Sequence, residues 1–316
     1  MNLFICRTIF QAYFASVIIE RKGIKDVVFI YLSEGCSDRE RTIITKYIDK
    51  YHIVSGDSFI SRIRSQLKVV AFLKKCMRVK TESYNIFFSS IDDPFIHTII
   101  SKFSFDNFYS FDDGTANYVD NSIFYAYKSL SLRVKMKYFL MGNRVRNIDD
   151  IKDRIQCHYS TNHLPNIIGN VEQISLGYSE NNHSNYLSDK KFVNIYLCPN
   201  FDEIYKHPEK VRFSFLSSLG NEDVVIPHPR DSFSWGDVEK FNLKANVIAE
   251  ECVSGFIDKG YTINLYGIAN STQYHYVHNK SVSNVVLDLG ELNDEFSAVI
   301  FRQIELFHHI CEIQIQ

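Results

Sequence analysis

Residues 2–32 read NLFICRTIFQAYFASVIIERKGIKDVVFIYL, and this stretch predicts a strand, a helix and a second strand. Its opening apolar run is typical of a short strand. Thr8 and Gln11 then have the spacing of a capping box, and apolar residues recur at helical spacing until Gly23 ends the helix. The closing run, DVVFIYL, is continuously apolar and β-branched, as expected of a parallel strand that is covered on both faces.

The same alternation continues along the chain and predicts an α/β fold. Further strands are expected at 85–88, 108–111, 193–198, 224–227, 262–267 and 284–290, and helices at 38–51, 58–75, 94–103, 242–259 and 295–311. Between residues 147 and 188 the pattern weakens, and the polar stretch GYSENNHSNYLSD indicates an exposed connection. Two successive α/β units favour two Rossmann-like domains that face each other across a cleft. The expected division is an N-terminal domain over 1–160, a connecting segment over 161–191 and a C-terminal domain over 192–316.

The composition is that of a soluble globular protein with a large core: 45% of the residues are hydrophobic and 23% are charged. The net charge of −2 provides no field that recruits nucleic acid, and no recognition motif is present, so a nucleic-acid module is not expected. The seven cysteines are scattered and form no CxxC pair, which argues against a disulfide framework and for a reducing compartment. The N-terminus lacks a basic n-region and a cleavage site, so it predicts neither a signal peptide nor a spanning helix. These features together predict a cytoplasmic protein.

Two basic runs, at residues 62–80 and 128–146, leave two interpretations open. Apolar residues lie between the basic ones, and such stretches can rest on an anionic membrane surface, here the inner face of the cytoplasmic membrane. The more frequent explanation is a solvated helix face that packs on a core. The final helix, at 295–311, is long and apolar on one face, which is compatible with a homodimer.

Residues that directly follow a strand are the candidates for function, because ligands of parallel α/β sheets bind beyond the carboxyl ends of the strands. No GxGxxG follows the first strand and no Walker sequence is present, which argues against dinucleotide oxidoreductases and P-loop enzymes. Asp112 and Asp113 follow the strand at 108–111, and Gly114 allows a positive φ, so a sharp turn can present a carboxylate to a ligand. An ordinary solvated turn is the alternative.

His228 lies between two prolines in IPHPRD, directly after another predicted strand. Pro227 and Pro229 restrict the backbone on both sides, which suits an imidazole that binds phosphate or donates a proton. A lone His is otherwise more often structural. Arg230 belongs to the same segment.

Two further loops follow strands of the second half. Asn200, Asp202 and the adjacent Glu203 follow the strand at 193–198, where an N-cap is the alternative interpretation. Ser271 and Thr272 follow the strand at 262–267 and suit phosphate binding at a helix start, although both residue types also cap helices without a ligand. The remaining pair of interest, His275 and His278, has no third ligand nearby, so no metal site is expected.

Taken together, FDDGTANY (111–118), QCHYST (156–161), IPHPRD (226–231) and NST (270–272) resemble the pattern of bacterial sialyltransferases. The particular resemblance is to glycosyltransferase family 52, the lipooligosaccharide sialyltransferases. The opening NLFICRTIFQAYFA also resembles the first strand and helix of that family. An acidic pair plus Gly in the first domain and His-Pro in the second also mark related sialyltransferase and polysialyltransferase families. The motifs therefore identify the chemistry better than the exact family.

The resemblance implies a GT-B fold, with two Rossmann-like domains facing a central cleft, and an inverting reaction that needs no metal or cofactor. The donor would be CMP-sialic acid, and the acceptor a terminal sugar of a cell-surface glycan or glycolipid, such as lipooligosaccharide or capsule. In such a transfer a base takes the proton of the acceptor hydroxyl, and the departing CMP phosphate needs stabilisation.

The resemblance leaves the identity of the base open. Related families place it in the Asp-Asp-Gly turn, at Asp112 or Asp113, whereas lipooligosaccharide enzymes suggest an acid before the His-Pro motif, here Asp202. His228 would act at the leaving phosphate. The expected substrate-binding residues are Thr8, Gln11, Gly114, Thr115, Asn200, Pro229, Arg230, Ser271 and Thr272, with Ser281 as an alternative for the phosphate.

Two other functions stay open. A transferase of the same fold with another donor, such as UDP-glucose, would have the same architecture. A catalytically silent glycan-assembly protein would not need Asp112, Asp113 and His228 together, which counts against that alternative.

Overall fold

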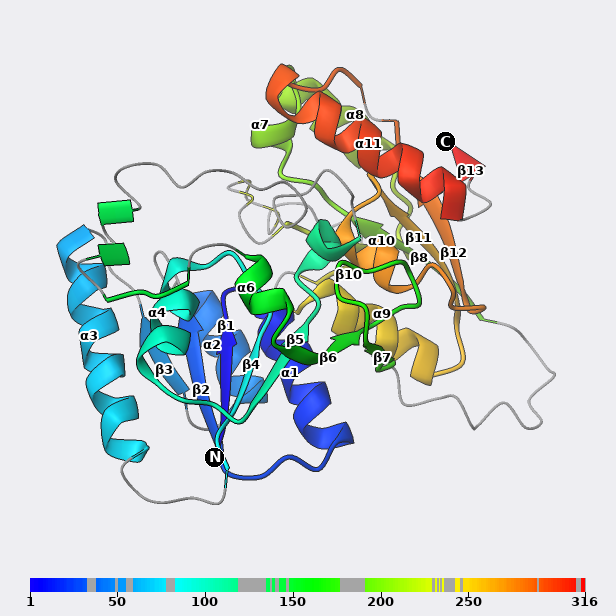
Figure 1. Cartoon of the computed structure of the whole chain (residues 1–316). Helices are drawn as coiled ribbons and strands as arrows, with labels where there is room; N and C mark the ends of the chain where they lie inside the picture. The colour runs from blue at the N-terminus through cyan, green and yellow to red at the C-terminus, as the bar shows by residue number, and fades with distance from the viewer. Residues whose placement is uncertain are drawn as a thin grey trace. The chain divides into compact units, whose positions relative to one another are not determined.

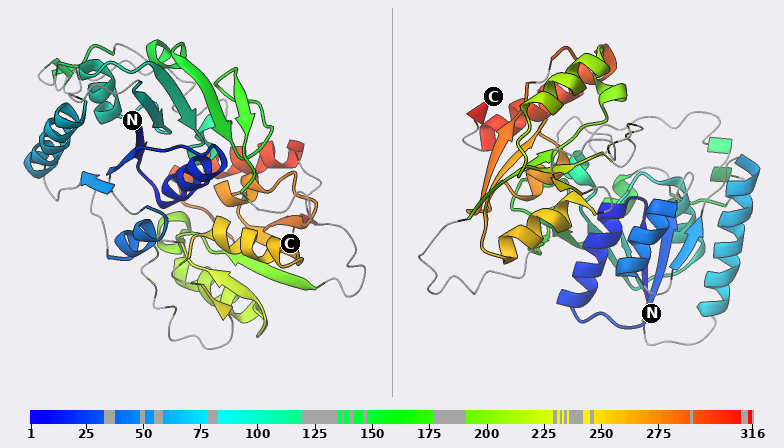
Figure 2. Two further views of the ribbon diagram at one scale, coloured as in Figure 1. Left: turned by 90° about the horizontal axis from the view of Figure 1, so that it is seen from below. Right: turned by 180° about the vertical axis from the view of Figure 1, so that it is seen from behind.

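The structure is a computed structural model, and it divides into two compact units, Met1–Ile174 and Ser175–Gln316 (Figure 1). The described residues are 1–32, 38–48, 51–54, 59–77, 83–118, 135–136, 138–139, 142–145, 148–176, 191–228, 231, 233, 235, 242–244, 247–288, 290–310 and 314–315. Each unit is a parallel sheet with helices against it, as the alternating sequence pattern predicts (Figure 2).

The first unit has a seven-stranded sheet in its described part, in the order β3-β2-β1-β4-β5-β6-β7. Every neighbouring pair is parallel. The strands are β1 (Asn2–Cys6), β2 (Val27–Leu32), β3 (Tyr51–Val54), β4 (Asn85–Phe88), β5 (Asn107–Phe111), β6 (Ile155–Ser160) and β7 (Val171–Gln173). The helices are α1 (Ile9–Arg21), α2 (Asp38–Tyr47), α3 (Phe59–Cys76), α4 (Pro94–Lys102), α6 (Asp149–Lys152) and the 3-10 turn η1 (Gly114–Asn117).

The two faces of this first sheet are packed differently. Successive strand residues point to opposite faces, so neighbours in β1 enter different layers. Phe4 stacks on Phe87 with ring centroids 4.2 Å apart, and Phe14 of α1 packs in the same aromatic layer. Leu3 enters the opposite, mainly aliphatic core with Leu73 of α3 and residues of α4. The high aromatic content of the sequence therefore serves core packing here.

The second unit has a six-stranded parallel sheet in its described part, in the order β10-β9-β8-β11-β12-β13. Its strands are β8 (Phe192–Leu197), β9 (Val224–Ile226), β10 (Asn242–Leu243), β11 (Thr262–Gly267), β12 (Val282–Val286) and β13 (Gln314–Ile315). Its helices are α7 (Phe201–Ile204), α8 (Pro208–Ser218), α9 (Ala249–Asp258), α10 (Ser271–His275) and α11 (Asp294–Ile310). Tyr196 and Tyr266 stack at 4.3 Å between neighbouring central strands.

Both strand orders are those of a Rossmann-like sheet, which confirms the predicted fold class. In each unit the first strand lies in the centre, and the chain then builds outward on one side before it crosses to the other. The direction of building changes between β1 and β4 in the first unit, and between β8 and β11 in the second. Loops at the carboxyl ends of such strand pairs form the usual ligand site of open α/β sheets.

The structure contains strands that the sequence pattern does not predict. The predicted helix at 38–51 ends at Tyr47, and the short segment Tyr51–Val54 pairs with β2 as β3. The QCHYST segment forms β6, which pairs with β5. Its inward residues include His158 and Ser160, which are buried through polar contacts, so the strand has no apolar period to detect.

Three predicted boundaries also differ from the structure. The first unit extends to Ile174, past the predicted boundary at residue 160, because β7 pairs with β6. The predicted helix at 242–259 begins only at Ala249, since Asn242–Leu243 pairs with β9 as β10. The strand predicted at 284–290 is β12, which ends at Val286.

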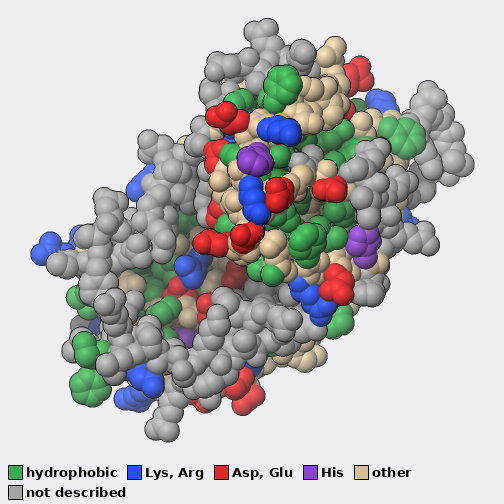
Figure 3. Space-filling model, turned by 90° about the horizontal axis from the view of Figure 1, so that it is seen from above, with side chains coloured by type: hydrophobic (Ala, Val, Ile, Leu, Met, Phe, Trp, Pro, Cys, Tyr) green, Lys and Arg blue, Asp and Glu red, His purple; other side chains and the backbone are tan. Residues whose placement is uncertain are grey.

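The basic run on α3 has the pattern of a solvated helix face. Arg64 and Lys68 are exposed, whereas Val70 and Leu73 are buried in the core of the first unit. On the face shown in Figure 3, described acidic and basic side chains are interspersed. Most of the second basic run, at 128–146, lies outside the described residues. Among the described helices, none has both the length and the apolar character that crossing a membrane requires.

Candidate functional site

Asp113 lies at the carboxyl end of β5, and groups that follow two other strands hold its carboxylate. Ser90, which follows β4, donates from Oγ to Oδ2 at 2.9 Å. Gln11, in the first turn of the helix after β1, donates from Nε2 to Oδ1. The Asp113 backbone N–H donates to Asn117 Oδ1 at 3.0 Å. The carboxylate therefore lies at the carboxyl ends of the strands, beside the point between β1 and β4 where the direction of building changes, which is the usual ligand position in this fold.

The surroundings of Asp113 change its acidity. Burial raises the pKa of its carboxyl, and the nearby Asp92 carboxylate raises it further. Hydrogen bonds from Ser90 and Gln11 and the charge of Arg7 act in the opposite direction, but the resulting pKa stays above the ordinary value of an aspartate. A carboxyl with a raised pKa holds an acquired proton better, which suits a general base.

Asp112, the other acid of the pair, is fully buried and engaged on both oxygens. His158 Nε2 lies 3.0 Å from Oδ1. Oδ2 accepts hydrogen bonds from Ser160 Oγ at 3.1 Å and from the Thr161 backbone N–H at 2.7 Å. These contacts tie the end of β5 to the end of β6, so Asp112 is an anchor for the turn and not a group that a substrate can reach. The geometry leaves Asp113 as the candidate base of the pair.

The same region holds a chain of contacts that resembles a hydrolase triad. Ser110 Oγ lies 2.8 Å from His158 Nδ1, and His158 Nε2 in turn lies 3.0 Å from Asp112. Ser110 is 1% exposed, and both His158 and Asp112 are 0% exposed. A nucleophilic serine must reach its substrate, so this chain is structural.

The turn around Asp113 is built as its sequence predicts. Gly114 has a φ of +56°, in the left-handed region that glycine adopts without strain. The predicted capping box at Thr8 and Gln11 is present: Thr8 Oγ1 accepts from the Gln11 N–H at 3.2 Å, and Gln11 Oε1 accepts from the Thr8 N–H at 3.4 Å and also from the Arg7 N–H at 2.6 Å. The Gln11 amide is thus engaged at both ends, so Gln11 positions Asp113 and is not free to bind substrate as predicted. The Thr115 side chain lies outside the described residues.

In the second unit, Asp202 lies in α7, after β8, and forms an ion pair with α8. Its Oδ1 is 2.9 Å from Nη2 of Arg212. The neighbouring Asn200 is the N-cap residue of α7, but its side chain makes no cap hydrogen bond. It donates instead from Nδ2 to Glu203 Oε2 at 3.0 Å. The amide of Asn200 is therefore held inside its own loop.

His228 follows β9, and a backbone hydrogen bond joins it to Asp231. The Asp231 N–H donates to the His228 carbonyl at 3.0 Å. The Asp231 carboxylate accepts from Trp235 Nε1 at 3.0 Å and from the Phe233 N–H at 3.1 Å. Of the predicted residues in this segment, Pro229 and Arg230 lie outside the described residues.

The loop between β11 and α10 is unusually tight. A Cβ on Gly267 would come within 2.6 Å of Gln273 Oε1, so only glycine fits there. Ala269 has a φ of +58°, which is uncommon for a residue with a side chain. Asn270 and Gln273 form a capping box that holds the start of α10. The helix start of α10 therefore depends on a glycine at position 267 and on an uncommon backbone conformation at Ala269.

The hydroxyl groups at this helix start differ in availability. Thr272 is buried and donates to the carboxylate of buried Glu250 at 2.8 Å, so its proton is not free for a phosphate. Ser271 is partly exposed in the first position of α10 and remains the better candidate. Ser281, the predicted alternative, directly precedes β12 and thus lies at the amino ends of the strands, away from the edge that carries the other candidates.

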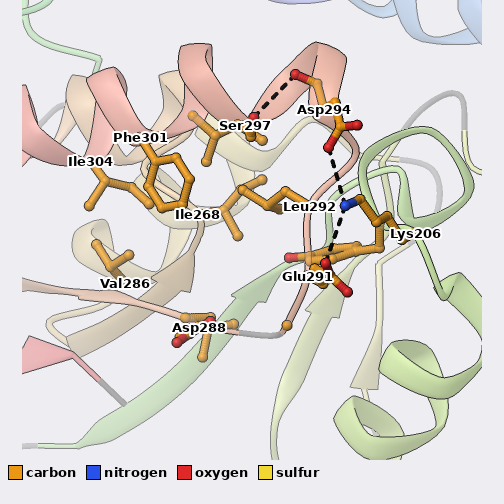
Figure 4. Close-up of a pocket in the computed structure, with 14 residues that line it drawn as sticks. Lys206, Ile268, Val286, Asp288, Glu291, Leu292, Asp294, Ser297, Phe301 and Ile304 are labelled. Carbon is orange, nitrogen blue, oxygen red and sulfur yellow. Dashed lines mark hydrogen bonds and ion pairs between the residues drawn. The ribbon is translucent and has the colours of Figure 1, made fainter.

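The second unit also contains a pocket of about 510 Å³ beyond the ends of β11 and β12 (Figure 4). One wall is apolar and includes Phe301 of α11. Asp288, Glu291 and Asp294 line it together with Lys206, which pairs with Glu291 and Asp294 at 3.2 Å each. Because acids outnumber bases there, the pocket is unsuited to an anionic group.

Several of these residues are not predicted from the sequence. Ser90 and Asp92 follow β4 and could have been found by the strand-end rule that finds Asp113. No local motif marks Arg212 or Glu250, whose contacts join distant segments. Among the described residues, no group of three His, Cys, Asp or Glu side chains is arranged to hold a metal ion.

The two Rossmann-like parallel units, each with polar groups at the carboxyl ends of its strands, have the fold of GT-B glycosyltransferases. The crystal structure of the glycotransferase of kitacinnamycin is similar over 99% of this chain and 86% of that chain, with a TM-score of 0.51 and 8% sequence identity. A likeness at this identity supports the fold alone.

Residues 25–290 match the profile of glycosyltransferase family 52, and the chain belongs to this family. It is therefore a glycosyltransferase, which takes a nucleotide-sugar donor and a glycan acceptor. The CMP-N-acetylneuraminate:beta-galactoside alpha-2,3-sialyltransferase of Pasteurella multocida is 28% identical over 80% of this chain and 81% of its own length. The N-acetyllactosaminide alpha-2,3-sialyltransferase of Haemophilus influenzae is 27% identical over 56% of this chain and 58% of its own length.

Proposed function

We propose that this glycosyltransferase is a sialyltransferase that moves sialic acid from CMP-sialic acid to a glycan acceptor, with inversion and without a metal. Both relatives named above are alpha-2,3-sialyltransferases, and their sequences align with this chain over 268 and 188 residues. The observation that carries the proposal is Asp113, a carboxyl of raised pKa held at the strand ends of the first unit of a family 52 chain.

The reaction assigns a separate task to each candidate group. Asp113 takes the proton of the acceptor hydroxyl as its oxygen forms a bond to the anomeric carbon of sialic acid. The bond between that carbon and the phosphate oxygen breaks, and CMP leaves with the bonding electrons. His228 stabilises the charge that develops on the phosphate, and Ser271 at the start of α10 offers a further donor. Asp202 stays the alternative base.

The acceptor is proposed from the names of the relatives and from the sequence. The Pasteurella multocida relative is named for beta-galactosides, and we propose a terminal galactose of a cell-surface glycan such as lipooligosaccharide or capsule as the acceptor here. An enzyme that transfers a sugar to such an acceptor would act in the cytoplasm, at the inner face of the membrane. The exposed basic residues of α3, among them Arg64 and Lys68, support contact with an anionic surface.

The proposal predicts that CMP stabilises the protein selectively. Thermal unfolding is measured with CMP, UDP and GDP at equal concentrations, and sialyl transfer from CMP-sialic acid to lactose is followed by mass spectrometry. A ligand at a hundred times its Kd stabilises a folded protein by about 2.7 kcal/mol, which is a readily measured shift in Tm.

The control is His228→Ala, which should retain its fold but lose most of the transfer activity. Stabilisation by UDP alone, with no sialyl transfer, would contradict the proposal and support a UDP-sugar donor. No response to any nucleotide would point to the catalytically silent alternative.

A further inference from the structure

Arg212 of α8 is a buried cation that pairs with the candidate residue Asp202 and with Asp231, which is hydrogen-bonded to the backbone of His228. It is 7% exposed. Its Nη2 atom lies 2.9 Å from Asp202 Oδ1 and 3.7 Å from Asp231 Oδ1. The guanidinium also lies over two rings, 4.6 Å from the centroid of Phe233 and 5.3 Å from that of Phe201. Rings and carboxylates together hold the guanidinium in one orientation.

Asp231 connects this cation to the turn that carries His228. Its side chain is 0% exposed, and its oxygens accept from Trp235 Nε1 and the Phe233 N–H. Its own N–H donates to the His228 carbonyl at 3.0 Å. A displacement of the Asp231 carboxylate would therefore move the backbone of His228.

Arg212 contacts Asp202 and Asp231 through the same nitrogen, so one guanidinium ties the loop after β8 to the turn after β9. A buried carboxylate such as Asp231 needs a compensating cation, and a lysine would supply the charge. A lysine would not supply the planar group that lies over the rings of Phe201 and Phe233. The requirement for arginine is therefore geometric.

We propose that Arg212 is a positioning residue of the transfer reaction, which holds Asp202 and the turn of His228 in one arrangement. It acts through these two residues and does not touch the substrate. This inference rests on the proposed function, because it gives Arg212 a role only if His228 acts in the transfer.

The test is a double-mutant cycle on sialyl transfer with Arg212→Lys, His228→Ala and the combined variant. A misplacement of about 1 Å can lower a rate about 100-fold, so Arg212→Lys should lower kcat about 10- to 100-fold. The KM for CMP-sialic acid should change less than about 3-fold, because no substrate contact is removed. In the His228→Ala background the same change should lower kcat several-fold less than in the wild-type background, since one of the two groups that Arg212 positions is gone.

Arg302→Lys is the matched control, because Arg302 forms an exposed ion pair with Glu305 at 2.7 Å in α11. It should leave kcat unchanged. If Arg212→Lys does not fold, as judged by circular dichroism, Phe233→Leu replaces it in the cycle, because it removes one of the two rings that contact the guanidinium.

Equal losses of kcat in the two backgrounds would show that Arg212 acts independently of His228 and would overturn the inference alone. Absence of sialyl transfer by the wild-type protein would overturn the proposed function and this inference with it. The two failures are thus distinguishable.

Discussion

The two units hold their candidate carboxylates in different ways. In the first unit, Asp113 is held by the neutral donors Ser90 and Gln11. In the second, Asp202 is paired with the guanidinium of Arg212. Burial keeps the pKa of the Asp113 carboxyl raised although the bonds from Ser90 and Gln11 lower it, whereas Asp202 is fixed by an ion pair. The comparison favours Asp113 for proton transfer and Asp202 for fixed geometry.

The adjacent acids Asp112 and Asp113 show the same principle within one turn. Asp112 is surrounded by donors from β6 and the residue after it, and it is fully buried. Asp113 is partly exposed and reaches the loops after β1 and β4. Successive side chains after β5 point in opposite directions. Asp112 therefore anchors the turn, whereas its neighbour Asp113 reaches the loops after β1 and β4.

The largest expected effect is on catalysis by Asp113→Asn. A general base contributes about 10²- to 10⁴-fold, so kcat should fall within this range while Tm changes little, because the amide keeps most of the contacts. Asp202→Asn should lower kcat less. Steady-state kinetics with CMP-sialic acid measure both variants, and a larger loss for Asp202→Asn would place the base in the second unit and reverse the comparison.

The second effect is on stability. Asp112→Ala leaves buried donors of His158, Ser160 and Thr161 without their acceptor, so the free energy of unfolding of the first unit should fall by about 3 kcal/mol. Urea unfolding followed by circular dichroism measures the loss.

Trp235 provides an internal control for that measurement. It is the single Trp of the chain and lies in the core of the second unit, so its fluorescence reports on that unit. The fluorescence transition should be unchanged in Asp112→Ala. A transition shifted as much as the circular dichroism would show that Asp112 does not act within the first unit alone.

Most of the fold could be predicted because apolar periodicity decides it. β1 and β2 are buried along most of their length and α1 buries its apolar residues, and the apolar runs and helical spacing of the sequence predict all three elements. β6 was not predicted, because its buried residues His158 and Ser160 are stabilised by Asp112, far away in the sequence. A polar residue that is buried through a distant partner leaves no local signal.

The residues of the candidate site also differ in whether a local sequence feature predicts them. The strand-end rule finds Asp113 and His228, because position after a strand is a local property. It does not find Arg212, whose partners Asp202 and Asp231 lie in two other segments. Gln11 was predicted as a substrate contact, but a helix-cap residue can also face inward, and only the fold shows that its amide reaches Asp113.

The smallest expected effect concerns the pH dependence of Asp113. Ser90→Ala removes a hydrogen bond that lowers the pKa of Asp113, so the pKa of that carboxyl should rise further. A base acts in its ionised form, and activity is lost as the pH falls through its pKa. The acidic limb of the kcat profile should therefore begin above the ordinary range of an aspartate in the wild type, and move to higher pH in Ser90→Ala.

The matched control is Ser16→Ala, because in the described part of the chain the Ser16 hydroxyl bonds within α1, to the Tyr13 carbonyl at 2.6 Å, and the substitution should leave the limb in place. The same raised pKa predicts that the free energy of unfolding falls as the pH rises from the ordinary range of an aspartate through the pKa of Asp113, because the unfolded chain releases this proton first. Asp113→Asn should remove that slope. An acidic limb that does not move in Ser90→Ala would show that another group is the base, and the contrast between neutral and cationic partners would then no longer explain the chemistry.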